Sequence, residues 1–382
     1  SAAVAKTARK GGHEALAAMI ERWGGGAAAT SNSSTVKPAA AMTGFARSIA
    51  KPPRAESAPS GSGDSLLSVG ALLGRGIFSE VHALDGNQVA TAGGGDGNTL
   101  LAVKTAKPFD ANGATSGDRS KGKMVVRELR VLRHLTDHPH IVRLHSARVV
   151  QASGGGGDGR GGGGVLTVQM VYERASTDLQ RLVNSDLKRK DTFGASSARK
   201  ACACQLLSGL HALHTIGVCH RDVKPANVLV FEGGVEGGGG PIYKLCDFGC
   251  ARGLSTNAPR RSGTLWYRAP EVVFTDGGRS SNSSCVVAAS HDLFALGATL
   301  TELLTGRPLL AANDEAHYAT LHANLGSNRV PKGAAKEEAM ALTRLLSDDP
   351  NERASASALQ GELKWLQLQS AVASQGRLIS LE

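Results

Sequence analysis

The sequence has no long apolar segment. No stretch approaches the roughly 20 consecutive apolar residues that a membrane-spanning helix needs, so no such helix is expected. Aromatic residues are also scarce, at 4% of the 382 residues. The total hydrophobic content of 41% is nevertheless enough for a sizeable core. The length allows either two or three average domains or one two-lobed catalytic fold of roughly 250 to 300 residues.

Cysteine is sparse and irregularly spaced. The six cysteines show no pattern of a disulfide framework, which suits a reducing compartment. Cys202 and Cys204 are close enough to suggest a metal, but no second Cys or His pair follows at zinc spacing. The pattern therefore favours ordinary buried thiols over a zinc site.

Acidic residues are too few to balance the basic ones. The net charge of +10 suggests nucleic acid or an anionic membrane as a partner. However, residues 1–60 carry eight Lys or Arg against three Glu, which is half of that excess, in a segment rich in Ala, Ser and Gly. This composition is typical of a disordered tail, so no specific nucleic-acid partner is expected.

The first 64 residues are predicted to be unstructured. Residues 1–64 read as a disordered basic leader with one amphipathic segment from His13 to Trp23, and residues 369–382 read as a tail. We expect an intracellular protein of the cytoplasm or nucleus. The alternative is an organelle transit peptide, because the leader is basic, Ser-rich and poor in acid.

A strand, a glycine turn and a second strand follow the leader. Ser65 to Leu73 reads as a strand, Gly74-Arg75-Gly76-Ile77-Phe78-Ser79 as the turn, and the next strand runs through Val81. At such a turn, backbone N–H groups can approach phosphate oxygens. An ordinary tight hairpin has the same pattern, so this turn alone does not define a nucleotide site.

An apolar strand farther along carries one lysine. In Leu100-Leu101-Ala102-Val103-Lys104 the lysine is costly unless it meets an anion, and a phosphate is one such anion. The helix pattern from Lys123 to Leu135 presents Glu128, a carboxylate that can hold the lysine in place. The alternative is a surface helix whose Glu128 pairs with a nearby Arg.

The segment from His220 to Leu229 contains the residue types that phosphoryl transfer requires. Transfer to a hydroxyl needs a carboxylate near the attacking oxygen, a cation on the γ-phosphate and oxygen ligands for Mg²⁺. These types occur here in order, in His220-Arg221-Asp222-Val223-Lys224-Pro225-Ala226-Asn227 and in Asp247-Phe248-Gly249.

From about residue 65 to 368 the chain resembles the eukaryotic protein kinase superfamily. Beyond the segments above, Ala269-Pro270-Glu271, Asp292 to Gly297 and Arg353 match the family in order, and the family pairs this arginine with Glu271. The resemblance implies an α+β, two-lobed protein kinase fold. A small antiparallel β-sheet lobe with the αC helix would cover about 65–173, and a larger, mainly helical lobe about 174–368.

The resemblance also implies the site residues and their cofactors, ATP and Mg²⁺. Asp222 would accept the hydroxyl proton, Lys224 would neutralise the γ-phosphate, and Asn227 would complete the catalytic set. Asn227 and Asp247 would hold magnesium. The nucleotide-binding residues would be Gly74, Gly76, Val81, Ala102, Lys104, Glu128, Tyr172, Glu173, Ala175, Leu229 and Asp247, with the backbone of Glu173 and Ala175 on the adenine.

Two segments resemble the branch of cyclin-dependent and mitogen-activated (CMGC) kinases. Tyr172 to Leu179 aligns without gaps with the lobe-joining segment of cyclin-dependent kinases, and Gly263 to Glu271 carries Trp-Tyr-Arg before Ala-Pro-Glu. The resemblance implies protein substrates with Ser or Thr acceptors, followed by proline as a preference. Gly263 suits such a pocket because it adopts positive φ at little cost. An activating partner protein is implied, and whether it is a cyclin stays open.

Three arginines, Arg127, Arg221 and Arg252, match the family's basic cluster for a phosphorylated activation loop. The family's phosphothreonine position falls near Pro259 and Arg260, neither of which can be phosphorylated in that way. Either a substitute among Ser255, Thr256 and Ser262 is phosphorylated, or a partner protein orders the loop without phosphate. Residues 276–288 lengthen the stretch that follows.

The leading reading is therefore an ATP-dependent protein serine/threonine kinase. The alternative from another class is a pseudokinase-type scaffold that binds partners without catalysis. A small-molecule kinase is disfavoured because Thr264 to Glu271 resembles a peptide-docking platform.

Overall fold

The computed structural model describes residues 67–84, 100–110, 116–135, 137–152, 165–185, 193–232, 240–274, 284–326, 329–353 and 355–362. The predicted leader, its segment from His13 to Trp23 and the tail at 369–382 lie outside the described residues. The chain divides into two compact units, which we describe separately. The first holds the residues up to Gly122 and His145–Val171, and the second holds Lys123–Leu144 and the chain from Tyr172 onward. The predicted lobe boundary near residue 173 stays a prediction.

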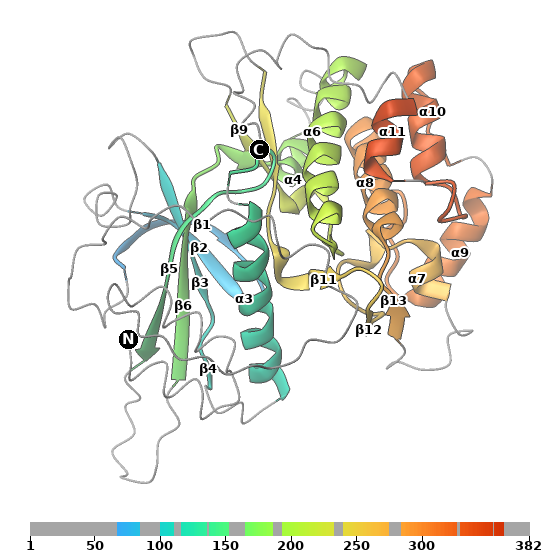
Figure 1. Cartoon of the computed structure of the whole chain (residues 1–382). Coiled ribbons are helices and arrows are strands. Elements are labelled where there is room, and N and C mark those ends of the chain that lie inside the picture. Colours follow the sequence, from blue (N-terminus) through green and yellow to red (C-terminus); the bar gives the residue numbers. More distant parts are fainter. Residues whose placement is uncertain are drawn as a thin grey trace, which may run out of the picture. The chain divides into compact units, whose positions relative to one another are not determined.

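The first unit is built on a six-stranded sheet in the order β1-β2-β3-β6-β4, with β5 also paired to β6 (Figure 1). The strands are β1 Val69–Arg75, β2 Ser79–Leu84, β3 Leu101–Ala106, β4 Phe109–Asp110, β5 Leu144–Ala152 and β6 Val165–Glu173. The pairs β1–β2, β2–β3 and β4–β6 are antiparallel. Leu67, Leu84, Leu101, Val103 and Val171 form its buried apolar cluster.

The glycine turn lies between β1 and β2, as the sequence predicts. The N–H of Gly76 donates to the carbonyl of Ser79 at 2.8 Å and closes the turn. The predicted strand from Ser65 to Leu73 is observed later, at Val69–Arg75, so it includes Gly74.

Helix α3 spans Ser116–Leu135, so it begins seven residues before the predicted start at Lys123. The apolar periodicity that predicts a helix starts only at Lys123, because the first two turns are polar and contain glycine.

The second unit is mainly helical. Its α-helices are α4 Leu179–Asn184, α6 Ser196–Thr215, α7 Pro270–Phe274, α8 Ala289–Thr305, α9 Glu315–Leu325, α10 Lys336–Leu345 and α11 Ala356–Glu362. Its short strands are β7 Thr177–Asp178, β8 Val218–Cys219, β9 Val228–Phe231, β10 Ile242–Leu245, β11 Arg252–Gly253, β12 Asn257–Pro259 and β13 Ser284–Val286. The described part of this unit also contains the 3₁₀ turns η3 Pro225–Asn227, η4 Phe248–Cys250 and η5 Leu265–Tyr267.

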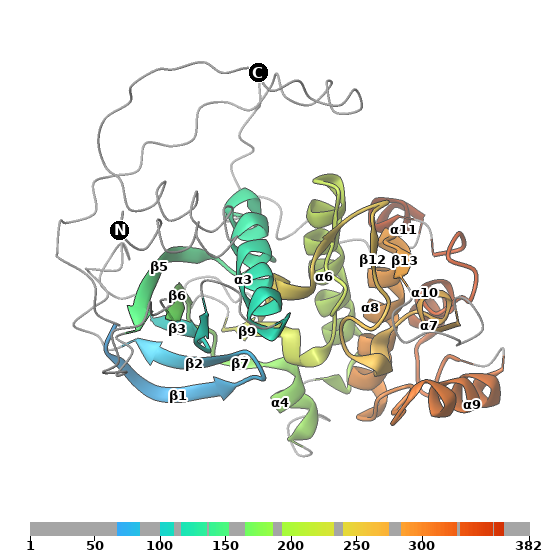
Figure 2. The same cartoon turned by 90° about the horizontal axis from the view of Figure 1, so that it is seen from below.

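Helix α8 is the centre of the second unit. Both views place α8 beside α6 (Figures 1 and 2), and every residue from Asp292 to Leu303 is buried. At Gly297 an added Cβ would lie 2.8 Å from the Cβ of Leu345, so only glycine allows α10 to approach this closely. Cys202 and Cys204 are buried on the neighbouring α6. In the part of the chain that the structure describes, no helix meets the length and hydropathy needed to span a membrane.

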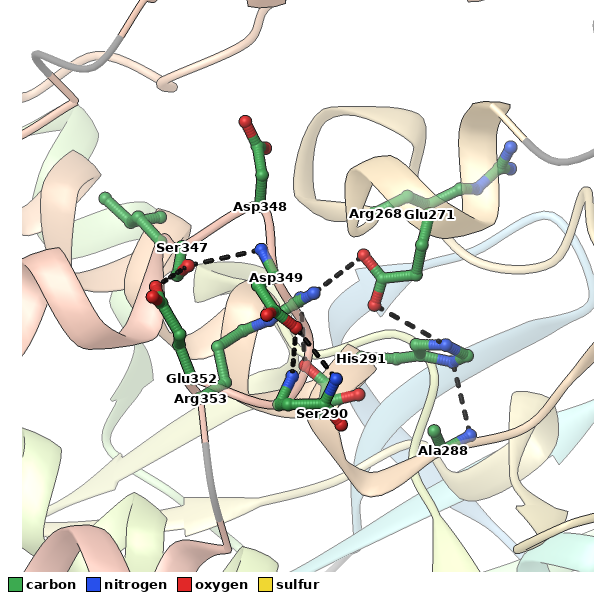
Figure 3. Close-up of polar contacts among 12 residues, drawn as sticks. Arg268, Glu271, Ala288, Ser290, His291, Ser347, Asp348, Asp349, Glu352 and Arg353 are labelled. Atoms are coloured by element: carbon green, nitrogen blue, oxygen red, sulfur yellow. Dashed lines mark hydrogen bonds and ion pairs between the residues drawn. The ribbon is translucent and has the colours of Figure 1, made fainter.

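The ion pair that the resemblance implies between Glu271 and Arg353 is confirmed. Figure 3 shows the buried Arg353 pointing toward Glu271, with Nη2 at 2.7 Å from Oε2. Its Nη1 donates to the carbonyl of Ser290 at 3.2 Å, and its guanidinium lies over the ring of Phe294. These contacts fix the loop after α10 to α7 and to the start of α8.

A second buried ion pair joins α6 to α10. Arg199 and Glu338 are 2% and 1% exposed, and Arg199 Nη2 donates to Glu338 Oε2 at 2.7 Å. Arg199 also donates to the carbonyls of Phe193 and Gly194. The pair is fully enclosed, so removing either charge would leave the other without compensation.

We therefore expect Glu338→Gln to lower the free energy of unfolding by about 3–5 kcal/mol, because it leaves the buried guanidinium of Arg199 without its counter-ion. Urea denaturation would measure the change. The matched control is Glu337→Gln, the exposed neighbour on the same helix, which should change stability by less than about 0.5 kcal/mol. Equal unfolding midpoints for the two variants would contradict the assignment.

Candidate active site

In the first unit, three predicted nucleotide-binding residues lie in line across three strands. Gly74 of β1 pairs with Val81 of β2, and Val81 pairs with Lys104 of β3. Cross-strand partners share one face of a sheet, and so does Ala102, two residues before Lys104. The structure thus gathers Val81, Ala102 and Lys104 on one face, beside the glycine turn.

In the second unit, the three predicted catalytic residues come together around Asp222. Its Oδ2 accepts from Lys224 Nζ and from Asn227 Nδ2, each at 2.9 Å. Its Oδ1 accepts from both the hydroxyl and the N–H of Thr264, at 2.9 and 2.8 Å. Lys224 Nζ also donates to Thr264 Oγ1 at 2.7 Å. Thr264 was not predicted as a site residue, although it holds the carboxylate in place.

Asp292, in the first turn of α8, holds the loop that contains Asp222 through hydrogen bonds to its backbone. Its carboxylate accepts the N–H groups of His220 and Arg221, both at 2.8 Å, and Nε2 of His214 at 2.9 Å. Arg221 has φ 69°, a left-handed backbone that non-glycine residues rarely adopt, and these bonds hold it there. Burial alone would raise the pKa of Asp292, but the hydrogen bonds from His214 and from the N–H of Arg221 hold that pKa at about 2.

Sequence reasoning placed Asp292 only in a segment that matches the family and missed its contacts with the loop. A signal was present, because an acid in the first turn of a mostly apolar helix needs buried partners.

His220 connects the catalytic loop to the segment that carries Asp247. Its Nδ1 accepts the N–H of Asp222 at 3.2 Å, so Nε2 carries the proton and donates to the carbonyl of Cys246 at 3.0 Å. Its ring contacts Phe248, with centroids 4.9 Å apart. The position of Asp222 is therefore coupled to that of Asp247.

The two predicted magnesium ligands, Asn227 and Asp247, fit a hard cation. The N–H of Cys246 donates to the carbonyl of Asn227 at 3.0 Å, so Asn227 lies next to the residue that precedes Asp247. Because Asn227 Nδ2 is committed to Asp222, its amide oxygen is the atom that remains for a metal. One carboxylate and one amide oxygen suit Mg²⁺, which usually takes its other ligands from water and substrate phosphates.

The sheet of β7, β9 and β10 positions three more of the predicted nucleotide-binding residues: Glu173, Ala175 and Leu229. The Glu173 carboxylate accepts from Lys244 Nζ at 2.7 and 2.8 Å, and Lys244 is the strand partner of Leu229. The N–H of Ser176 donates to Val230, which places Ala175 beside the same sheet. The N–H of Glu173 donates to the carbonyl of Arg143, so its own carbonyl is the group that fits a contact with adenine.

Glu128 is buried rather than on a surface helix, which overturns the alternative of an exposed Glu–Arg pair. It is 4% exposed, and its Oε1 accepts the hydroxyl of Tyr172 at 2.8 Å. Burial and the neighbouring carboxylate raise the pKa of Tyr172 well above its usual value, so Tyr172 stays a donor. One residue earlier, Arg127 Nη1 donates to the carbonyl of Gly249 at 2.9 Å. Sequence reasoning did not predict this pair of anchors for α3.

The chain belongs to the protein kinase family. It matches the protein kinase domain over residues 67–365, which is most of its length. The protein named "Putative cyclin-dependent kinase F-2" from Oryza sativa subsp. japonica is 37% identical over 193 residues, covering 50% of this chain and 52% of that protein. Mitogen-activated protein kinase HOG1 of Candida albicans is 28% identical over 225 residues, covering 59% and 48%.

These relatives confirm the predicted resemblance to the cyclin-dependent and mitogen-activated branch, and the chain spans about half of their length. Among solved structures, a chain of the CAK complex from Chaetomium thermophilum bound to ATP-gamma-S has a TM-score of 0.58 at 22% identity. The match covers 79% of this chain and 91% of that one. At this identity it shows the fold alone, and it confirms the predicted protein kinase fold.

The hydrogen bond between Tyr172 and Glu128 gives a direct test of this part of the site. Tyr172→Phe keeps the ring but removes a buried bond to a carboxylate, so we expect a loss of about 1–3 kcal/mol in the free energy of unfolding. Urea denaturation would measure it.

The matched control is Tyr243→Phe. The hydroxyl of Tyr243 is buried without a hydrogen-bond partner among the described residues, so its removal should be neutral or slightly stabilising. If both variants lose the same stability, the bond to Glu128 contributes nothing specific.

Proposed function

We propose that this chain is an ATP-dependent protein kinase that phosphorylates serine or threonine side chains of other proteins. The observation that carries the proposal is the cluster in which Asp222 is held by Lys224, Asn227 and Thr264. A half-buried carboxylate beside an ammonium group and a metal-binding pair matches what phosphoryl transfer to an alcohol needs. Family membership supports the same reading.

The residues divide the chemistry between them. When bound, magnesium-ATP supplies the transferred phosphoryl group and the metal charge that stabilises it. Asp222 orients the incoming hydroxyl and accepts its proton on the carboxylate. Lys224 lies close enough to contact both this carboxylate and Thr264, so it can place its charge beside the reacting oxygen. Asn227 and Asp247 hold the metal.

Asp222→Asn tests the proposal. Asparagine keeps the shape and one acceptor oxygen but cannot take the proton, so we expect kcat to fall by about 100-fold or more while the fold is kept. Incorporation of labelled phosphate into a protein substrate would measure it, with the exposed Asp137→Asn as the control. A wild-type chain that transfers no more phosphate than Asp222→Asn would favour the pseudokinase scaffold.

We further propose that the kinase prefers proline directly after the acceptor. Gly263 has φ +76°, and an added Cβ would lie 2.2 Å from the carbonyl oxygen of Arg221. The carbonyl of Gly263 already accepts Arg268 Nη2 at 2.6 Å, and that of Ser262 accepts Arg268 Nε at 3.1 Å. A substrate N–H at this place would stay unpaired, whereas proline has no N–H to lose.

Peptides that differ only after the acceptor test this preference. We expect proline to be favoured over alanine by about tenfold in kcat/KM, the cost of one unpaired N–H. N-methylalanine, which also lacks the N–H, should recover most of the difference, and Arg268→Ala should reduce the preference. Equal rates for the proline and alanine peptides would contradict it.

A further inference from the structure

The segment from Arg252 to Thr264 leads from Asp247 to the substrate side of the site, and backbone pairing orders its first half. Arg252 and Gly253 of β11 pair with Cys219 and Val218 of β8. The N–H of Leu254 then donates to the carbonyl of Gly217 at 2.7 Å. We call residues 252–264 the activation segment.

The middle of the activation segment pairs with β13, which comes from the stretch that lengthens this chain before α8. Figures 1 and 2 both show β12 beside β13. The register sets Asn257, Ala258 and Pro259 opposite Val286, Cys285 and Ser284. The ladder continues past the strands, because the N–H of Ser255 donates to the carbonyl of Val287 and the N–H of Val287 donates to Thr256, both at 2.9 Å.

A small apolar cluster lies beneath this pairing. Cys219, Ala258 and Val287 are 0%, 1% and 1% exposed, and Leu254 packs against them. Each comes from a different strand region, so the cluster forms only when β13 and the activation segment are paired. Burial of this apolar surface adds to the stability of the backbone ladder.

The second half of the activation segment is held by Glu315, at the start of α9. Arg260 is 2% exposed, and its Nη2 donates to Glu315 Oε2 at 3.0 Å while Nη1 donates to the carbonyl of Val273 at 2.6 Å. The more exposed Arg261 donates to both oxygens of the same carboxylate, at 3.0 and 3.2 Å. Two cations that follow β12 are thus fixed by one acid.

The three arginines predicted to receive a phosphate have backbone acceptors here. Arg221 Nη2 donates to the carbonyl of Pro259 at 2.6 Å, and Arg252 Nη1 donates to that of Ala251 at 2.9 Å. The bond of Arg252 is local, but those from Arg221 to Pro259 and from Arg127 to Gly249 join residues far apart in the chain and already hold this region in place. A phosphate would accept charge-assisted hydrogen bonds from these arginines and so order the activation segment. The structure shows the segment ordered without a phosphate.

We propose that β13 and Glu315 order the activation segment in the way that a bound phosphate would. The substrate-binding end of the segment is then ordered in the unphosphorylated chain. The proposal rests on the proposed kinase function and concerns the regulation of that site. Glu315 and Val287 act as positioning residues, because they contact the segment and not the reacting atoms. Phosphorylation of Ser255, Thr256 or Ser262, and ordering by a partner protein, are the competing explanations.

Hydrogen–deuterium exchange on the full chain tests the ordering without relying on catalysis. The chain is treated with a phosphatase, and its intact mass is checked for loss of all phosphate. We expect the amides of Ser255 and Val287 to exchange at least about 100-fold more slowly than free peptides. Exchange at the free-peptide rate, with protection appearing only after phosphorylation, would overturn the proposal.

Peptide kinetics on the same samples test the consequence for the site. Phosphatase treatment and the triple variant S255A/T256A/S262A should change kcat/KM by less than about threefold. Glu315→Gln should raise the peptide KM by about fivefold and leave the ATP KM unchanged, a split that general destabilisation would not produce. The exposed Glu337→Gln is the matched control.

Val287→Pro removes the N–H that donates to Thr256 and should have a larger effect than Glu315→Gln on both protection and peptide KM. A tenfold or greater loss of activity on dephosphorylation, restored by rephosphorylation, would overturn the proposal. If no form of the chain phosphorylates a peptide, the kinase function fails, and the exchange data alone decide whether β13 orders the segment.

Discussion

The buried carboxylate of Asp292 is the point on which the candidate site depends. It takes two successive N–H groups of the catalytic loop, from His220 and Arg221, and thereby holds a left-handed residue directly before Asp222. A strained backbone persists only where its surroundings over-determine it, and here the support comes from the most deeply buried helix of the second unit. The geometry around Asp222 is therefore set by the packing of α8.

Much of the fold could be predicted from the sequence, because the motifs that carry the chemistry also mark the turns and strands of the fold. The glycine turn lies between two strands and Lys104 is on a strand, as predicted. Lys224 and Asn227 both lie within hydrogen-bonding distance of Asp222. These residues are two to five positions apart in one loop, so their closeness in space follows directly from their spacing in the sequence.

The contacts that could not be predicted join residues far apart in the chain. The bond from Tyr172 to Glu128 crosses 44 positions, and no periodicity in either segment indicates it. The pairing of β13 with β12 was missed for another reason: Ser284 to Val286 is too short to show a strand pattern, and it lies in a stretch that looked like a loop extension. Sequence patterns identify elements, but they do not say which element a three-residue strand will meet.

Helix α9 contacts both the activation segment and the residues that follow it. Besides Glu315, the hydroxyl of Tyr318 donates to the carbonyl of Arg268 at 2.7 Å, and Arg268 in turn holds Gly263, the neighbour of Thr264. A displacement of α9 would thus reach Asp222 through three hydrogen bonds and the peptide bond between Gly263 and Thr264. Inactivating substitutions collected without regard to the chemistry should therefore gather on this helix as well as around Asp222.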